Sequence, residues 1–528
     1  MTTQVCLVRP PILVPKSHPI VQFTPPIGIA YIAGSLRNAD IDVLVVDGLG
    51  EALDNRHHAD NDCYIYGLHP DEVVARIPET ADVIGISASF SFEWPTCRDL
   101  IGRIRKRFPS ALLVGGGEHI TALPELSLTE SALDVAVMGE GEETFLNVVN
   151  LRLSGGQDLS SINGILFQSA DGEIHKTPPH GRIRDLDAIP LPAWDKIPIE
   201  EYLDRGMGFG VNRGRSMPVL ASRGCPFQCT FCSSPQMWTT RWVPRDADLL
   251  LDELAYYQER YGVTNFDFYD LTAIVKKSWI VDFCKKIEER GMTFTWQLPS
   301  GTRSEAIDRE VADYLYKSGC RNLSYSPESG SPTVLTRIKK RIKTKSVSDS
   351  IRSSVEAGLN VKCNLIIGFP DETYKEVFET LAYAVELAMA GAHDLSIWVF
   401  SPYPGSELFE ELTTSGVISM NDAYYDDLRS YADTNRTKSF TTHVTSERLK
   451  LLRRVGTLAF YLASWARRPW RPFAMLRNVI SGKQESRAEL ALSTMFKRST
   501  METSDKLASE SYTGKVSAPS EISSSNKP

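Results

Sequence analysis

Two series of short apolar runs, each alternating with stretches of helical period, restrict the possible folds of this 528-residue chain more than any other feature. In the first series the runs are rich in Val and Ile, as buried parallel strands are. Strands are expected at residues 5–8, 41–46, 82–87, 111–115 and 133–138, and helices around 28–37, 70–77, 96–108 and 142–153. This series predicts an open, doubly wound α/β domain over residues 1–155, with its ligand beyond the carboxyl ends of the strands.

The second series begins near residue 216. Strands are expected at 218–222, 265–269, 293–297, 322–325, 361–368 and 395–400, and helices between them at 277–290, 304–317, 347–357 and 374–389. Six successive strand–helix units predict a partial (βα)6 barrel over residues 216–420. In such barrels the chemistry takes place at the C-terminal ends of the strands.

The segments that flank the barrel differ in character. Residues 156–215 contain a Gly-Gly boundary, an Asp-Gly turn and several prolines, which predict a short hairpin followed by a linker. Residues 421–499 form a mainly helical C-terminal region, and its clearest helix is expected at 446–465. The final segment, 500–528, contains eight serines and neither Trp nor Phe, so we expect a disordered tail.

Composition and charge exclude several classes of protein. Lys and Arg number 58 against 66 Asp and Glu, a formal net charge of −8, so a general polyanion binder is disfavoured and no nucleic-acid partner is expected. No apolar run approaches the roughly 18–20 residues that cross a bilayer, and the first residues lack the pattern of a signal peptide. Nine cysteines, a sparse and odd set, argue against a secreted disulfide framework and for a cytoplasmic protein.

Three of these cysteines form the most informative motif. Cys225, Cys229 and Cys232 have the spacing CxxxCxxC and directly follow the first expected barrel strand. A structural zinc site would need a fourth Cys or His at finger spacing, and none follows in the sequence. Three thiolates on one tight loop can hold a 4Fe–4S cluster and leave one iron without a protein ligand. The motif therefore predicts a cluster with one iron open to a substrate.

Further segments follow the expected strands in the order known from one superfamily. They are Phe231 before the third cysteine, then Phe268-Tyr269-Asp270, Arg303, Glu328-Ser329-Gly330-Ser331, Gly368–Thr373 and Pro402–Ser406. Over about residues 216–410 the chain resembles the radical S-adenosylmethionine (SAM) superfamily, except that Tyr269 stands where that family often has an acid. The resemblance implies that the cysteine triad binds a 4Fe–4S cluster and that SAM is contacted by Phe231, Asp270, Arg303, Glu328 and Ser329.

The first domain carries a second resemblance. Its segments 25–34, 115–119 and 139–142 resemble those of the cobalamin-binding domain that precedes the radical SAM barrel in one large subgroup. The resemblance implies a Rossmann-like domain whose cobalamin is contacted by Ser87, Ser89, Gly115, Gly116, Gly117 and Glu140. A glycine run would let the backbone approach a large flat ligand closely. The alternative, a degenerate domain of this fold that binds nothing, is disfavoured by the barrel downstream.

One loop departs from the pattern DxHxxG, in which many cobalamin domains place a His ligand for cobalt. Asp47 is followed by Leu49 at the histidine position and by Ala52 at the glycine position. We therefore expect no His ligand from this loop. His57 and His58 lie nearby, and we interpret them as solvated histidines of an acidic, irregular surface loop.

Near the C-terminus, residues 465–473 mix aromatic and basic side chains. They could contact a membrane surface or an anionic substrate, or form a helix end that caps the barrel. Two prolines interrupt any long amphipathic helix, and the capping role is favoured.

Together these features predict a cobalamin-dependent radical SAM enzyme. The resemblance implies that a 5′-deoxyadenosyl radical from SAM activates a carbon and that methylcobalamin methylates it. The expected substrate is a small molecule, natural-product or lipid-like. One alternative is a radical SAM cyclase or rearrangement enzyme that uses cobalamin without methyl transfer, and another is a non-catalytic cobalamin sensor, which would not need an open iron. The expected partners are this substrate and an external electron donor of the flavodoxin or ferredoxin type, and peripheral contact with a membrane is left open.

Overall fold

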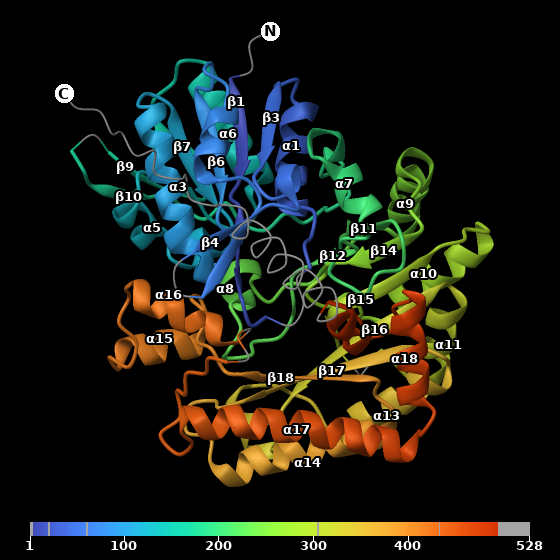
Figure 1. Ribbon diagram of the computed structural model, residues 1–528. Helices are drawn as coiled ribbons and strands as arrows, with labels where there is room; N and C mark the ends of the chain where they lie inside the picture. Colours follow the sequence, from blue (N-terminus) through green and yellow to red (C-terminus); the bar gives the residue numbers. More distant parts are fainter. Residues whose placement is uncertain are drawn as a thin grey trace, which may run out of the picture.

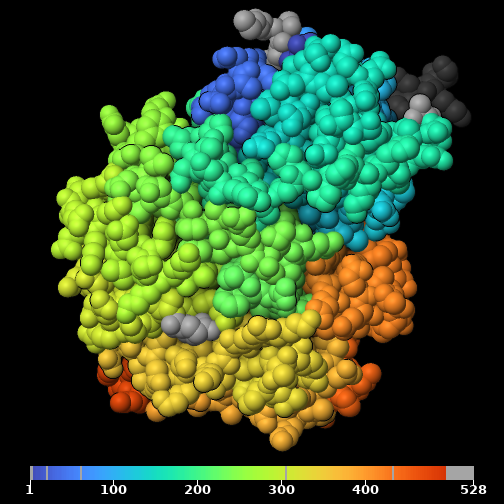
Figure 2. All heavy atoms as spheres, turned by 180° about the vertical axis from the view of Figure 1, so that it is seen from behind, coloured from blue at the N-terminus to red at the C-terminus, as the bar shows by residue number. Residues whose placement is uncertain are grey.

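The computed structural model describes residues 4–18, 22–59, 62–169, 171–303, 306–431, 433 and 435–494. The predicted disordered tail at 500–528 lies outside the described residues. Two α/β units face each other, with the N-terminal unit above the barrel in Figure 1. From behind, the blue and teal surface of the first unit adjoins the green and yellow surface of the second (Figure 2).

The N-terminal sheet has seven strands in the order β10-β9-β8-β7-β6-β1-β3. They are β1 (Val5–Arg9), β3 (Val43–Asp47), β6 (Val83–Ser87), β7 (Leu112–Gly116), β8 (Val135–Val137), β9 (Ile165–Gln168) and β10 (Ile174–Lys176). The first five are parallel, and the hairpin β9–β10 extends the sheet in antiparallel fashion. Strand order reverses beside β1, which is where open α/β sheets bind their ligands.

Helices cover both faces of this sheet because side chains of a strand point alternately to either side. Val5 and Leu7 belong to one apolar cluster, which α1 and α6 complete, whereas Cys6 and Val8 belong to the other, with α2 and α3. The helices are α1 (Ile27–Asn38), α2 (Pro70–Arg76), α3 (Trp94–Arg107), α4 (Glu118–Ala122), α5 (Pro124–Glu130) and α6 (Gly141–Leu153). The prediction of a doubly wound domain is confirmed.

A small antiparallel sheet beside this domain corrects one expectation. It consists of β2 (Ile12–Pro15), β5 (Cys63–Tyr66) and β4 (Arg56–Ala59). His57 and His58 lie on β4, opposite Ile65 and Tyr64, so the irregular loop expected here is wrong. A short polar run carries no strand signal of its own, and only its pairing with β5 makes it a strand.

The barrel sheet has the order β11-β14-β15-β16-β17-β18, and all neighbouring strands are parallel. The strands are β11 (Ser216–Val219), β14 (Asn265–Phe268), β15 (Thr295–Thr302), β16 (Cys320–Glu328), β17 (Asn360–Ile367) and β18 (Asp394–Val399). Because β11 and β18 lie at opposite ends of the sheet, the barrel is partial, as predicted. The run expected at 218–222 is divided between β11 and a short strand, β12 (Ser222–Arg223), which pairs with β13 (Val243–Pro244).

Helices connect the barrel strands, and several of them begin where the sequence supplies a capping side chain. The side chain of Asp246 accepts hydrogen bonds from the first free N–H groups of α9, and Thr373 forms a capping box with Glu376 at the start of α14. The helices of this half are α7 (Ile199–Asp204), α8 (Ser234–Trp238), α9 (Ala247–Tyr261), α10 (Lys277–Glu289), α11 (Arg309–Lys317), α12 (Pro332–Arg337), α13 (Thr344–Glu356), α14 (Tyr374–Ala390), α15 (Glu407–Thr414) and α16 (Asp422–Leu428).

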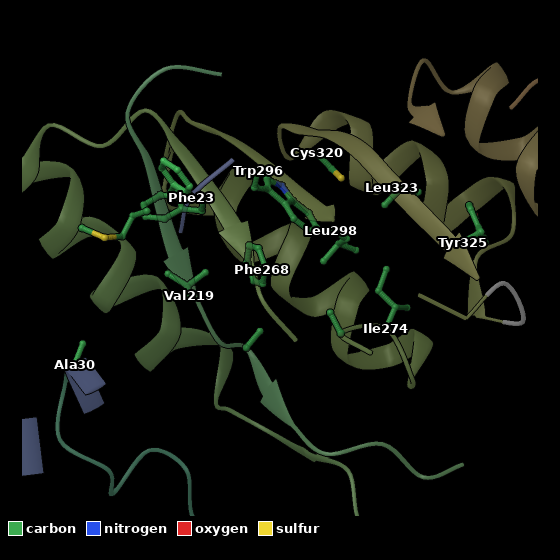
Figure 3. Packing of buried hydrophobic residues seen from close by; sticks show 14 of the residues in the cluster. Phe23, Ala30, Val219, Phe268, Ile274, Trp296, Leu298, Cys320, Leu323 and Tyr325 are labelled. Carbon is green, nitrogen blue, oxygen red and sulfur yellow. The ribbon is translucent and has the colours of Figure 1, made fainter. Parts of the chain in front are cut away.

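The main apolar cluster runs from the first domain into the barrel without interruption. Ala30 of α1 and Phe268 of β14 are both members, and Figure 3 shows Phe268 beside Trp296 in the barrel wall. The ring centroids of Phe268 and Trp296 are 5.1 Å apart, and Trp296 is fully buried. Since burial of apolar area is the main stabilising term in folding, the two units stabilise each other.

Of two C-terminal helices, α17 (Ser446–Arg467) packs against α14 and β18, and α18 (Arg471–Ser481) follows at its end (Figure 1). Arg468 donates to the carbonyl of Ala388, and Arg471 donates to those of Gly391 and Ala392, so both cap the C-terminal end of α14. These contacts agree with the capping role expected for residues 465–473. None of the helices in the described part of the chain has the length and apolar character required to cross a membrane.

Candidate active site between the two domains

A cavity of about 480 Å³ lies between the carboxyl ends of the N-terminal strands and the barrel. The six residues predicted to contact cobalamin all line it: Ser87, Ser89, Gly115, Gly116, Gly117 and Glu140. The barrel side contributes Leu220, Ser222, Arg223, Gly224, Met237, Trp238, Tyr269 and Leu271. The sequence predicted the first set from its motifs but not the barrel-side set, which comes from segments far apart in the chain.

Glycines make the floor of this cavity open and flat. A Cβ built on Gly28, Gly116 or Gly139 would meet no atom within 4 Å, so empty space lies directly over their backbone. Gly117 has φ +118°, and a Cβ there would lie 2.5 Å from the carbonyl oxygen of Ala88. Only glycine suits that position. Such a floor fits a large planar ligand such as a corrin ring.

The Asp47 loop has a structural role. Asp47 is fully buried, and its carboxylate accepts hydrogen bonds from the Tyr202 hydroxyl at 2.7 Å and from the N–H groups of Leu49 and Gly50. No histidine occurs among the described residues that line the cavity. The absence of a His ligand for cobalt from this loop stays a prediction.

Glu140 joins the cavity floor to the barrel. Its carboxylate forms ion pairs with Arg182 at 2.7 Å and with Arg223 at 3.2 Å, and Arg223 also pairs with Glu142 at 2.6 Å. Burial lowers the pKa of Arg223, but the charges of Glu142 and Glu140 outweigh it and raise the pKa overall. Neither Arg223 nor Glu142 was predicted as a site residue from the sequence; the position of Arg223 two residues before Cys225 was the available signal.

The cysteine triad lies on the loop between β12 and α8, next to this junction, and all three thiols are free and half-buried. No group of three His, Cys, Asp or Glu side chains in the described part of the chain is arranged to hold a metal ion. A single zinc ion would require sulfur atoms that converge within about 2.3 Å of one point. In a 4Fe–4S cluster each thiolate binds a different iron, so three cysteines on one loop can hold such a cluster without converging on one point.

Two of the predicted SAM residues pack around the cysteine loop. The ring of Phe231 lies 5.6 Å from that of Phe369, which follows β17. The guanidinium of Arg303 lies 3.6 Å from the ring centroid of Phe227, between the first two cysteines, and donates to the carbonyl of Arg341. Both contacts hold the loop against the barrel rim.

A third predicted residue, Glu328, forms a buried ion pair with Lys340 at 2.9 Å. Burial raises the pKa of Glu328, and the charge of Lys340 lowers it. Lys340 also acts on Cys229, where burial raises the thiol pKa and the lysine charge lowers it. The sequence did not predict a role for Lys340 either, although this residue lies in the basic run 339–341.

Asp270 and Ser329 are engaged within the protein. Asp270 accepts hydrogen bonds from the hydroxyl of Ser222 at 2.5 Å and from the N–H of Ala221, and burial raises its pKa to about 6. The Ser329 hydroxyl contacts that of Thr380 on α14 at 2.8 Å. Asp270 thus holds the strand that leads into the cysteine loop, and the roles of both residues as SAM contacts stay predictions.

Family models match both halves of the chain. The model described as the radical SAM superfamily matches residues 219–384, and the model of the B12 binding domain matches residues 18–149. The two matches meet at the cavity, since the first covers the cysteine loop and the second covers the glycine floor.

Several characterised or named proteins are similar over most of the chain. An uncharacterized methyltransferase of Pyrococcus horikoshii is 31% identical, over 87% of this chain and 92% of its own length. Cytidylyl-2-hydroxyethylphosphonate methyltransferase of Streptomyces wedmorensis is 28% identical, over 77% and 81%. Anaerobic magnesium-protoporphyrin IX monomethyl ester cyclase of Rubrivivax gelatinosus is also 28% identical, over 74% and 66%.

Among solved structures, the radical SAM methyltransferase TsrM of Kitasatospora setae, with cobalamin and a [4Fe-4S] cluster bound, superposes with a TM-score of 0.63. The sequences are 16% identical, and the match covers 88% of this chain and 89% of that one. At this identity the likeness establishes the shared fold.

Proposed function

The chain belongs to the cobalamin-dependent radical SAM methyltransferase family, and on that premise we propose that it methylates an unactivated carbon of a small-molecule substrate. The observation that carries the proposal is the shared cavity. Its floor is the glycine-lined surface of the B12-binding domain, and its opposite wall comes from the barrel strands beside the cysteine loop. Two cofactors that act on one substrate need such a common space.

When bound, a 4Fe–4S cluster, SAM and cobalamin would supply a carbon-centred radical and a transferable methyl group. The remaining work falls to the protein's own residues. Cys225, Cys229 and Cys232 would hold the cluster. Glu328 and Lys340 place a carboxylate and an ammonium group side by side near Cys229, a pair suited to the charged amino-acid end of SAM.

Other residues fix the cofactors relative to each other and keep water out. The buried pairs of Arg223 with Glu140 and Glu142 hold the start of the cysteine loop against the N-terminal domain. Apolar side chains line the space between, among them Trp238 and Leu271. We propose a natural-product or lipid-like substrate, because a largely apolar wall binds apolar carbon skeletons.

We also propose that a small one-electron donor protein of the flavodoxin or ferredoxin type reduces the cluster, and that the enzyme works in the cytoplasm. The support for the second point is the set of nine free thiols, which an oxidising compartment would not preserve.

The second candidate is a radical cyclase or rearrangement enzyme that works without methyl transfer, and the similarity to the anaerobic cyclase favours it.

One experiment distinguishes a methylase from a cyclase or rearrangement enzyme. The reconstituted protein is incubated anaerobically with methyl-deuterated SAM, a chemical reductant and a small-molecule extract of the source cells, and products are followed by mass spectrometry. A methylase releases 5′-deoxyadenosine and S-adenosylhomocysteine in nearly equal amounts and labels its product. Turnover without S-adenosylhomocysteine and without label would establish the second candidate instead.

A further inference from the structure

The helices α17 and α18 carry a row of exposed apolar side chains that the fold does not use. We name the following set the α17–α18 face: Leu451, Val455, Leu458 and Leu462 on α17, Trp470 between the helices, and Phe473, Leu476 and Ile480 on α18. Ile480, Phe473 and Trp470 are exposed to 77%, 74% and 63%, the highest values among the large apolar side chains of the described residues. Apolar side chains gathered in this way mark an interaction site.

The spacing makes each helix amphipathic. On α17 the exposed residues recur at intervals of three and four, opposite the buried Leu449, Leu452 and Phe460. Both helices lie on the side that faces the viewer in Figure 1, and from behind the red end of the chain is visible only at the lower margins (Figure 2). The two helices therefore lie on one side of the molecule.

Charge on the same segment indicates what covers this face. Residues 446–483 contain nine Lys and Arg and a single acid, Glu447, in a chain whose formal net charge is −8. Arg468 and Arg471 cap α14, but Arg448, Arg467, Arg477 and Lys483 are exposed. Basic residues around an exposed apolar stripe are the pattern of helices that lie in the interface of an anionic membrane.

Other occupants suit the face less well. A second copy would bring the same positive charge against itself, and like charges across an interface are unfavourable. The segment 495–528 of this chain contains five basic and four acidic residues, so it offers no complementary charge. A nucleic acid would complement the arginines but not eight exposed apolar side chains.

We propose that the α17–α18 face docks on an anionic lipid membrane. The apolar side chains enter the boundary between headgroups and acyl chains, the basic side chains contact the headgroups, and Trp470 lies at the level that tryptophan prefers. The protein would therefore bind the membrane surface peripherally. The proposal goes beyond the proposed function and does not depend on it, because binding needs neither substrate nor turnover.

The test uses the full-length holoenzyme and two kinds of vesicle, phosphatidylcholine alone and phosphatidylcholine with an equal share of phosphatidylglycerol. We expect co-sedimentation with the anionic vesicles, little with the neutral ones, and a steep fall in binding as salt is raised. The double variant Leu458→Glu/Ile480→Glu should weaken binding at least about tenfold. Arg477→Ala and Lys483→Ala should each weaken it about fivefold.

Leu249→Glu is the matched control, since Leu249 is 49% exposed on α9, outside this face. It should bind anionic vesicles as the unchanged protein does, and the iron content of all variants reports that they fold. Equal binding by the Leu458→Glu/Ile480→Glu variant and the unchanged protein would overturn the proposal, as would no binding to anionic vesicles. A dimer that Leu458→Glu/Ile480→Glu dissociates would assign the face to a second copy, and binding that arises only after deletion of residues 495–528 would assign it to that segment.

Discussion

The two sides of the cavity are built for their ligands by different means. The N-terminal side offers backbone and small side chains, with open space over Gly28, Gly116 and Gly139. The barrel contributes buried charges instead: Arg223 pairs with Glu140 and Glu142 of the N-terminal domain at the cavity, and Lys340 pairs with Glu328 near the cysteine loop, outside the residues that line the cavity. A flat, bulky ring is thus accommodated by shape, whereas a cluster and an amino-acid cofactor call for fixed charges and thiolates.

The largest effect is expected when only the cysteine ligands of the barrel are removed. Changing Cys225, Cys229 and Cys232 together to Ala should abolish the 4Fe–4S cluster and all formation of 5′-deoxyadenosine, since no thiolate remains to hold iron. Cobalamin binding should persist because the glycine floor is untouched. Iron and sulfide assays and the visible spectrum of bound cobalamin measure both sides. Retention of the cluster would contradict the assignment of the triad.

A second variant removes the ion pairs that join the N-terminal domain to the barrel. Arg223→Met leaves Glu140 and Glu142 without this partner in a buried site, which should cost about 3–5 kcal/mol of unfolding free energy. The matched control is Arg352→Met, whose pair with Asp349 is solvent-exposed and should contribute at most about 1 kcal/mol. Urea unfolding compares the two variants. Equal losses would show that Arg223 is not a structural link.

A third prediction concerns the pH dependence of the barrel side. Burial raises the pKa of Asp270 to about 6, from 3.8 in the unfolded chain. As pH rises from about 4 to 6 the unfolded chain loses this proton first, so the group's contribution makes the folded state less stable across that window. The shift corresponds to about 3 kcal/mol at most.

Asp270→Asn removes this contribution, so the unfolding free energy of the unchanged protein minus that of the variant should fall across the same window. Urea titrations at a series of pH values measure it. A difference that stays level between pH 4 and 6 would show that Asp270 is not held in a buried, raised-pKa state.

The smallest effect is expected for a variant in the glycine floor of the cavity. Gly116→Val would project into the cavity without backbone strain, since its φ is not left-handed, and should weaken cobalamin binding about tenfold or about 1.4 kcal/mol. Gly102→Val is the matched control: Gly102 also faces open space, but on α3 outside the cavity. Cobalamin titration of both variants decides whether the floor acts by shape; equal affinities would mean that it does not.

The local sequence was sufficient to predict the features that depend on residues close together in the chain. Apolar runs of Val and Ile predicted the positions of β1, β6 and β17, since a buried parallel strand needs apolar side chains on both faces. The spacing of Cys225, Cys229 and Cys232, and the glycines at 115–117, identified two ligand-binding loops because each loop lies within a few residues of sequence.

Features that depend on contacts between residues far apart in the sequence could be found only in the folded structure. The strand at His57 exists only through its pairing with β5, and the ion pair of Arg223 with Glu140 joins residues 83 positions apart. The roles of Asp270 and Arg471 follow from the groups that they meet, a hydroxyl on β12 and the carbonyls at the end of α14. A sequence records which side chains are present, but burial and charge pairing are properties of the space that the folded chain encloses.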